Sequence, residues 1–211
     1  MKKILITGCC GFIGYHTAIR FLKNKNIKVI GIDNINDYYD VNLKKARLKI
    51  LKQKKNFEFK KIDISIYKKL FEKIYRLKID VIIHLAAQAG VRNSINNPNQ
   101  YFVSNLHGFH NILEISKVLK IKHLLFASTS SVYGNAKKFP LKEIFNTDEP
   151  QSFYAATKKS NEISAYSYSK IYKIPITAMR FFTVYGPYGR PDMALFKFTK
   201  CIFENKPISL Y

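Results

Sequence analysis

The sequence predicts a doubly wound α/β fold, in which helices cover both faces of a parallel sheet. Two observations support this prediction. The apolar run at residues 4–6 leads into Thr7-Gly8-Cys9-Cys10-Gly11-Phe12-Ile13-Gly14, which has the pattern of a strand, a tight turn and the start of a helix. Beyond it, apolar runs of strand length alternate with longer amphipathic segments along the whole chain, which is typical of strand–helix–strand units.

In the first half of the chain, strands are expected at residues 3–7, 28–32, 57–62 and 80–84, because these runs are short and rich in Ile, Val and Phe. The first helix, at residues 12–23, carries apolar residues near helical spacing. A basic helix is expected at residues 43–54 and a third helix at 67–77, with loops at 35–40 and 88–98.

In the second half, strands are expected at residues 123–127 and 176–180. The helical patterns here cover residues 99–119, 152–172 and 193–204, and the segments 135–151 and 181–192 are expected to be loops. The hydroxyl-rich run Ser128-Thr129-Ser130-Ser131 follows the fifth strand directly. Ligands of doubly wound folds gather at the carboxyl ends of the strands, so these hydroxyls are expected at a binding site.

Composition favours a globular protein, with 47% apolar and 24% charged residues and no apolar stretch near the ~18 residues of a membrane helix. A cytoplasmic protein without a membrane partner is therefore expected. The net charge of +22 suggests either a polyanionic partner or a compositional habit of the source. The lysines are scattered among Ile and Asn, which favours the second interpretation and no specific binding of nucleic acid.

The three cysteines show no metal-ligand spacing and no disulfide framework. Cys9 and Cys10 are adjacent within the glycine turn, and Cys201 lies far along the chain. They are expected to be reduced thiols packed as small residues, and no metal site is predicted.

The glycine turn predicts a dinucleotide site. Glycines at 8, 11 and 14 allow a positive φ, a close approach to a pyrophosphate and close contact between helix and strand. Taken alone, the pattern is equally consistent with a structural turn. Asp33, at the end of the second strand, favours the site because a carboxylate there accepts hydrogen bonds from the adenosine ribose. It also favours NAD over NADP, since it would repel a 2′-phosphate.

Other strand ends supply further candidates. Asp63 and Ile64 follow the third strand and suit an adenine contact, although Asp63 is as well explained as the cap of the next helix. Leu85, Ala86 and Ala87 follow the fourth strand and would let a cofactor lie against the backbone. A lone histidine at a strand end, His84, is interpreted as a structural hydrogen-bonding group.

Tyr154 and Lys158 are four residues apart in a predicted helix, so the phenol and the ammonium group share one face. A phenol with a pKa of about 10 is a poor base at neutral pH, and lowering that pKa by ~3 units takes roughly 4 kcal/mol. A nearby lysine and a cationic nicotinamide ring would supply such stabilisation. With 14 tyrosines in the chain, a pair of this kind also arises by chance. The pair follows the glycine turn and the hydroxyl run along the chain, and this order favours a functional role for Tyr154 and Lys158.

Together these residues resemble the extended short-chain dehydrogenases/reductases, and within them the nucleotide-sugar epimerases. The stretches at 33–40, 87–92 and 180–194 are similar to UDP-glucuronate 4-epimerases. The resemblance covers all 211 residues. Its shared pattern comprises Thr7-Gly8-x-x-Gly11-x-x-Gly14, Asp33, Asp63-Ile64, His84-x-Ala86-Ala87, Asn105, Ser128-Thr129, Tyr154-x-x-x-Lys158 and Arg180-Phe181-Phe182.

The resemblance implies NAD-dependent interconversion of UDP-glucuronate and UDP-galacturonate, a supply step for cell-surface polysaccharide. Tyr154 would take the proton of the C4 hydroxyl, Thr129 would bind that hydroxyl, and Lys158 would hold the nicotinamide ribose and lower the tyrosine pKa. The implied cofactor contacts are Gly8, Gly11, Phe12, Ile13, Gly14, Asp33, Asn34, Asp63, Ile64, Leu85, Ala86, Ala87, Asn105, Tyr154 and Lys158. The implied substrate contacts are Ser130 and, for the carboxylate, Arg190 with Arg92 as the second choice.

The sequence departs from the family in three ways. Small residues such as Ala are usual where Cys9 and Cys10 stand, and Tyr is usual in place of Asn93. Family members also continue well past Tyr211. We therefore expect a dinucleotide-binding domain over residues 1–180 and an incomplete start of a substrate-binding region over residues 181–211.

Alternatives remain within and outside this enzyme class. Related decarboxylases and dehydratases place an acid after the catalytic threonine, where this chain has Ser130 and Ser131. A catalytically impaired cofactor-binding remnant is the other alternative. The helices expected at 99–119 and 152–172 carry apolar residues on more than one face, which predicts a homodimer through these helices rather than packing under loops alone.

Overall fold

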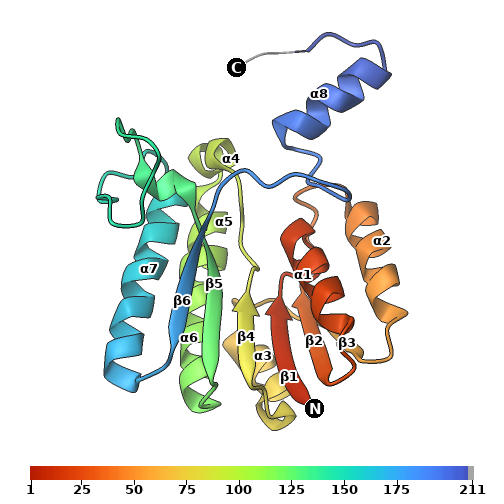
Figure 1. Ribbon diagram of the computed structural model, residues 1–211, viewed down its shortest axis with the longest axis vertical. Coiled ribbons are helices and arrows are strands. Elements are labelled where there is room, and N and C mark those ends of the chain that lie inside the picture. Colours follow the sequence, from red (N-terminus) through yellow and green to blue (C-terminus); the bar gives the residue numbers. More distant parts are fainter. Residues whose placement is uncertain (209–211) are drawn as a thin grey trace.

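The computed structural model describes residues 1–208 and contains the expected parallel sheet (Figure 1). The six strands run in the order β3-β2-β1-β4-β5-β6, and every neighbouring pair is parallel. The doubly wound fold class is confirmed. The strands are β1 (Lys2–Thr7), β2 (Ile27–Asp33), β3 (Phe57–Lys61), β4 (Val81–His84), β5 (His123–Thr129) and β6 (Ile176–Phe181).

Helices cover the two faces of this sheet because successive strand residues point to opposite sides. Leu5 and Ile82 face one core, which the helices α3 (Tyr67–Ile74), α6 (Gly108–Val118) and α7 (Phe153–Tyr172) close. Ile6 and Ile83 face the other core, under α1 (Phe12–Leu22) and α2 (Val41–Lys52). Figure 1 shows these two layers on either side of the strands.

All strand ends that precede a cofactor or catalytic candidate lie at the same, upper edge of the sheet in Figure 1. The last helix, α8 (Ala194–Phe203), lies beyond this edge, and its exposed side chains include Leu195, Phe196, Ile202 and Phe203. Within residues 1–208, no helix is long and apolar enough to cross a membrane.

Most predicted elements are present with ends shifted by one or two residues, but three segments differ from the prediction. The expected loop at 88–98 contains a short helix, α4 (Val91–Asn96). The expected helix at 99–119 consists of α5 (Pro98–Tyr101), a π-helical turn η2 (Phe102–His107) and α6. The third helix also ends in a 3₁₀ turn, η1 (Tyr75–Leu77).

Local capping explains where two of the helices begin. The Asp40 carboxylate accepts a hydrogen bond of 2.8 Å from the Asn42 N–H at the start of α2. The Ser152 hydroxyl accepts one of 3.1 Å from the Ala155 N–H at the start of α7. Each cap satisfies a backbone donor that the helix cannot pair internally. The cap of α7 matters for the site because this helix carries Tyr154 and Lys158.

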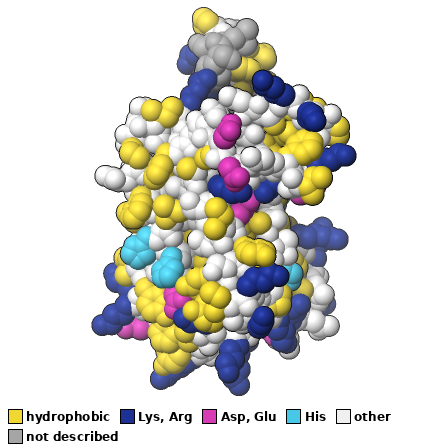
Figure 2. Space-filling model, turned by 90° about the vertical axis from the view of Figure 1, so that its left-hand side faces the viewer, with side chains coloured by type: hydrophobic (Ala, Val, Ile, Leu, Met, Phe, Trp, Pro, Cys, Tyr) yellow, Lys and Arg dark blue, Asp and Glu magenta, His cyan; other side chains and the backbone are white. Residues whose placement is uncertain are grey.

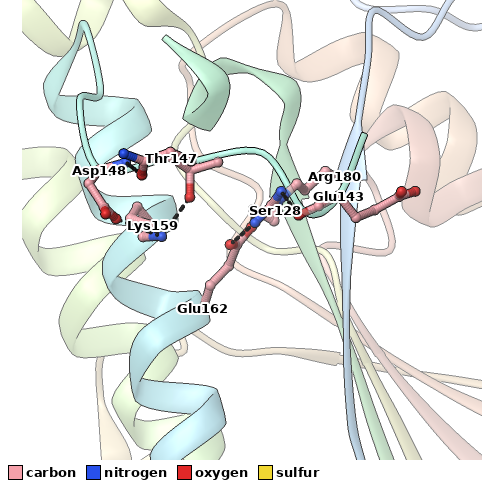
Figure 3. A network of polar contacts seen from close by, with 8 residues as sticks. Ser128, Glu143, Thr147, Asp148, Lys159, Glu162 and Arg180 are labelled. Atoms are coloured by element: carbon pink, nitrogen blue, oxygen red, sulfur yellow. Dashed lines mark hydrogen bonds and ion pairs between the residues drawn. The ribbon is translucent and has the colours of Figure 1, made fainter. Parts of the chain in front are cut away.

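A polar network holds α7 against the strands β5 and β6 (Figure 3). The Arg180 guanidinium donates to both carboxylate oxygens of Glu162, at 3.0 and 2.8 Å, and to the Glu143 carbonyl at 3.1 Å. The Ser128 hydroxyl also donates to Glu162. These bonds lower the pKa of Glu162 although its burial acts in the opposite direction. Because Glu162 lies one turn after Lys158, the network fixes α7 close to this lysine.

Candidate active site

A cleft of about 630 Å³ opens at the carboxyl ends of the strands. The candidates named from the sequence line it, with the exception of Asn105. The lining residues are Gly8, Gly11, Phe12, Ile13, Gly14, Asp33, Asn34, Asp63, Ile64, Leu85, Ala86, Ala87, Arg92, Thr129, Ser130, Tyr154, Lys158 and Arg190.

The glycine turn lines the cleft, and its geometry requires glycine at two positions. Gly8 has φ +69°, and a Cβ there would lie 2.7 Å from the Ala86 nitrogen. A Cβ on Gly14 would lie 2.1 Å from the Gly8 carbonyl oxygen. The turn thus brings β1, the strand end after β4 and the start of α1 into backbone contact. The first N–H groups of α1 lie at the cleft, where the helix dipole favours an anion such as a pyrophosphate.

Asp33 lies beside this turn and is nearly buried. Its carboxylate accepts hydrogen bonds from the backbone N–H groups of Cys10, at 3.0 Å, and Ile35, at 2.8 Å. Burial raises the pKa of Asp33, while these hydrogen bonds and the cations of Lys44 and Arg47 oppose the increase. The carboxylate is therefore held rigidly at the cleft wall, in the position expected for a ribose contact.

Asp63 is tied to the same wall rather than to a helix. The Asn34 amide donates to it at 2.9 Å, and the Ser65 backbone N–H donates to it at 2.9 Å. The following helix α3 has Ile66 as its N-cap, so the alternative interpretation of Asp63 as the cap is wrong.

Thr129, Tyr154 and Lys158 also line the cleft. Burial raises the pKa of the Tyr154 phenol, whereas the Thr129 hydroxyl and the Arg190 cation act to lower it. Lys158 is fully buried and donates to the Ala127 carbonyl at 2.9 Å. The depression of the Tyr154 pKa by Lys158 stays a prediction.

The burial of Lys158 has an electrostatic consequence. Removing the ammonium group from water disfavours its charged form and lowers its pKa to about 8. At neutral pH the lysine therefore stays mainly charged, but close to the point at which it would lose its proton. A buried cation on the same helix face as a phenol stabilises negative charge on nearby oxygen atoms, including those of a bound ligand.

Asn105 is not among the residues that line the cleft, and its expected cofactor contact stays a prediction. It is buried within η2, and its side chain accepts from the Gln88 N–H at 2.8 Å and donates to the Gln88 carbonyl at 3.0 Å. It also donates to the Thr157 hydroxyl at 3.1 Å. Asn105 thus fixes the loop after β4 to the helix that carries Tyr154 and Lys158.

Arg190 reaches the cleft but has a carboxylate partner within the chain. Its guanidinium pairs with Asp192 through Nε–Oδ1 at 3.0 Å and Nη2–Oδ2 at 2.5 Å. The Tyr38 hydroxyl donates to the same carboxylate at 3.4 Å. The bidentate face that was predicted to bind a substrate carboxylate is therefore directed at Asp192. Arg92 and Ser130 also line the cleft, the former as an exposed residue in α4.

Sequence reasoning missed several residues at the cleft, among them Gln88, Lys44 and Lys197. Lys44 is buried and donates to the Asn36 carbonyl at 2.7 Å. Scattered lysines in a chain with this composition gave no signal that would distinguish it. Gln88 lies in the stretch at 87–92, whose similarity to UDP-glucuronate 4-epimerases was the signal that could have identified it.

Arg47, from α2, is a further residue that the sequence analysis did not single out. It is fully buried and donates to the Cys10 carbonyl at 2.9 Å and the Tyr39 hydroxyl at 2.6 Å. Its other nitrogen donates to the carbonyls of Tyr188, at 2.6 Å, and Gly189, at 3.2 Å. One guanidinium thus joins the glycine turn to the loop that carries Arg190.

His84 has the structural role expected for it. Its Nδ1 lies 2.8 Å from the Thr7 hydroxyl, and its ring packs on Phe109. Complete burial lowers the pKa of His84 to about 3, so the ring is neutral at physiological pH.

The family model described as GDP-mannose 4,6 dehydratase matches residues 5–207. The chain belongs to this family. Its membership confirms the resemblance to extended short-chain dehydrogenases/reductases that the motifs predicted.

Among curated members of this family, Protein CapI of Staphylococcus aureus is 53% identical over 209 residues. UDP-glucuronate 4-epimerase of Thermodesulfobacterium geofontis is 46% identical over 211 residues. These alignments cover 99% and 100% of this chain but 62% and 65% of the two relatives. The chain therefore spans less than two thirds of the length of these proteins.

A solved structure shares the fold closely. UDP-glucuronic acid 4-epimerase from Bacillus cereus, in complex with UDP-glucuronic acid and NAD, aligns with a TM-score of 0.91 and 38% identity. The alignment covers 99% of this chain and 65% of that structure.

Proposed function

We propose that this chain carries the NAD site and the catalytic residues of a UDP-glucuronate 4-epimerase. The main support is that one cleft brings together the glycine turn, the Asp33 carboxylate and the group formed by Thr129, Tyr154 and Lys158. The relatives of Thermodesulfobacterium and Bacillus cereus bear the same activity in their names. A cytoplasmic site of action and a role in polysaccharide precursor supply follow from this substrate class.

The residues present fit NAD. Backbone N–H groups at the start of α1 would hold the pyrophosphate, and Asp33 would accept the adenosine ribose hydroxyls. The carboxylate also favours NAD over its 2′-phosphorylated form. When bound, NAD supplies reversible hydride transfer at the sugar C4.

The protein groups would manage the proton of the C4 hydroxyl. Tyr154 would accept this proton as hydride leaves C4 and return it when the 4-keto sugar is reduced on its other face. Thr129 would hydrogen-bond the same hydroxyl and orient it. Burial raises the pKa of Tyr154, so its activation as a base needs positive charge from the nicotinamide ring and from Lys158 once a ligand bridges the two side chains.

The substrate carboxylate would be bound at the Arg190 end of the cleft. Since Arg190 already pairs with Asp192, binding of a hexuronate requires the arginine to exchange one carboxylate for another or to share it. Ser130 and Arg92 line the same cleft and would complete the polar surroundings. The chain has serines after Thr129 where decarboxylases and dehydratases have an acid, which favours epimerisation.

The proposal is tested by cofactor titration and product analysis of the chain. We expect NAD to bind at least tenfold more tightly than NADP, because of Asp33. UDP-glucuronate should be converted to UDP-galacturonate, and Tyr154→Phe should retain NAD binding while losing turnover. Tighter binding of NADP would contradict the cofactor assignment, and UDP-xylose as the product would identify a decarboxylase.

We further propose that residues 1–180 form the NAD-binding domain and that the segment from 181 onward begins the substrate-binding region. This segment supplies Arg190 and Lys197 to the cleft wall. It also forms an apolar groove of about 450 Å³ along α8, lined by side chains such as Leu195 and Phe203.

Finally, we propose a homodimer through η2, α6 and α7. Phe102, Val103, Ile163 and Tyr166 are 55, 45, 59 and 67% exposed, respectively. Figure 2, which faces the side of the molecule formed by α7, shows hydrophobic side chains spread across this face. Apolar side chains in this number favour burial against a second copy.

Light scattering tests the dimer. Ile163→Asp is expected to convert the dimer to a monomer, whereas Phe203→Asp, an equally drastic change on α8, should leave the dimer intact. A monomer mass for the unmodified chain at micromolar concentration would contradict the proposal. Phe109 belongs to the helical region at 99–119 through which a dimer is predicted, but it is 1% exposed and packs in the core, so charging it would unfold the chain.

A further inference from the structure

The glycine turn carries two neighbouring thiols that the proposed epimerase chemistry does not use. The sulfur atoms of Cys9 and Cys10 lie 3.9 Å apart, and both side chains are fully buried. The Asp33 carboxylate completes a cluster in which one ligand atom from each residue lies within 4.8 Å of the others. No metal-ligand spacing is visible in the sequence because Asp33 lies 23 residues beyond Cys10.

The spacing of these atoms matches what a thiophilic cation requires. Zinc binds thiolate sulfur at ~2.3 Å in a tetrahedral arrangement, which separates two ligand sulfurs by about 3.8 Å. The observed separation of 3.9 Å therefore needs almost no rearrangement of the two side chains. Two thiolates and one carboxylate are also a donor set that Zn²⁺ and the softer Cd²⁺ both accept.

The surrounding charge would tolerate an occupied site. Two thiolates, one carboxylate and a divalent cation carry a net charge of −1. The Lys44 ammonium group lies close enough to Asp33 and Cys10 to interact electrostatically with both, and Arg47 acts on Asp33 in the same way. The Arg47 guanidinium also donates to the Cys10 carbonyl at 2.9 Å. These cations would offset the buried negative charge of the complex.

We propose that Cys9, Cys10 and Asp33 form a binding site for a thiophilic divalent cation, Zn²⁺ or Cd²⁺, and that this cation and NAD exclude each other. The exclusion rests on the proposed NAD site. A carboxylate oxygen that coordinates a metal can no longer accept a hydrogen bond from the adenosine ribose. The hydrogen bond that the Cys10 N–H donates to Asp33 must also change when the metal binds. The cation binding itself depends only on the three side chains.

Titration of the reduced chain with Cd²⁺ alone tests the site. Cadmium bound to thiolates gives an ultraviolet charge-transfer band, which should reach its full intensity at one equivalent. Cys9→Ala and Cys10→Ala should each weaken Cd²⁺ binding at least tenfold, and Asp33→Asn should weaken it without removing the band. Cys201→Ala is the matched control and should bind Cd²⁺ like the unmodified chain.

The result that would overturn the site is a band that survives in the Cys9→Ala, Cys10→Ala double variant or depends on Cys201. Circular dichroism establishes that each variant is folded, and Cys→Ser variants provide a second set of nearly equal size. If these serine variants retain Cd²⁺ binding, the site is likewise excluded.

Competition separates the two proposals. Saturating Cd²⁺ should raise the apparent Kd for NAD at least tenfold in the unmodified chain and leave it unchanged in the double alanine variant. If NAD fails to bind even without Cd²⁺, the proposed function is wrong while the cation site stands. If NAD and Cd²⁺ bind together without mutual effect, the exclusion is wrong.

Discussion

Lys158 should make the stability of this protein depend on pH in the alkaline range. Burial lowers its pKa to about 8 from 10.5. Between these two values the unfolded chain binds more protons than the folded chain, so the free energy of unfolding gains a contribution that rises with pH. Integrated from about pH 7 to about pH 9.5, this contribution amounts to about 2 kcal/mol.

Replacing Lys158 with methionine isolates this contribution. Lys158→Met keeps an unbranched side chain of similar length but removes the titrating group and the hydrogen bond to the Ala127 carbonyl. Methionine does not titrate, so the pH dependence of the difference in stability between the two proteins comes from Lys158 alone. The difference in unfolding free energy, unmodified chain minus variant, should therefore increase by about 2 kcal/mol from pH 7 to about pH 9.5.

Urea denaturation followed by circular dichroism measures this difference, since the chain has no tryptophan. Lys158→Leu serves as a second variant and should give the same pH dependence with a different offset. A difference that stays constant within ~0.5 kcal/mol over the range would show that the lysine is not desolvated as the structure indicates.

Three further outcomes follow from the contacts described above. Gly14→Ala should destabilise the chain by roughly 1–3 kcal/mol and abolish NAD binding, because its Cβ would lie 2.1 Å from a backbone oxygen; thermal unfolding and cofactor titration measure both effects. Phe109→Ala should lower the free energy of unfolding by about 3–5 kcal/mol, since it removes a buried ring from the core, and a loss below ~1 kcal/mol in urea denaturation would contradict this packing. Acidification should destabilise the protein through His84, whose pKa falls from 6.5 to about 3 on folding. The contribution of the neutral His84 ring to stability is fully present above the pKa of the unfolded state and is lost as the pH falls below it. The difference in unfolding free energy between the unmodified chain and His84→Gln should therefore shrink by about 2 kcal/mol from pH 7.5 to pH 5.

The sheet and the cleft could be predicted because their signals are local. Each strand is a short apolar run, and a parallel arrangement places all the strand ends at one edge. Gly8, Asp33 and Tyr154 were therefore assigned to one site although they are far apart in sequence. Helix α4 was missed because six residues beside Pro98 are too few to show a helical period.

The orientation of the long helical region could not be predicted from spacing. Phe102 and Phe109 are seven residues apart, which places them on one face of a regular α-helix. The π-helical turn η2 inserts extra chain between them, and each inserted residue turns the helix by about 100°. Phe102 consequently faces solvent while Phe109 lies in the core.

The hydrogen-bond and ion-pair partners of the side chains in the site could not be predicted from the sequence either. Arg190 and Asp192 are two residues apart in a loop, and no periodic pattern indicates whether such side chains meet. Asn105 shows the same limit, because its hydrogen bonds to Gln88 and Thr157 join three separate segments. Such contacts arise from the tertiary arrangement rather than from any neighbouring run of residues.

The guanidinium of Arg47 connects two segments that are far apart in the sequence. It donates hydrogen bonds both to the turn that contains Cys10 and to the loop at Tyr188 and Gly189, so a shift of either segment changes the hydrogen bonds of the other. A substitution of Arg47 in α2 would therefore alter the position of Arg190 at the cleft. Under the proposed function, laboratory selection for new sugar preferences should yield changes around residue 47 as well as along the cleft wall.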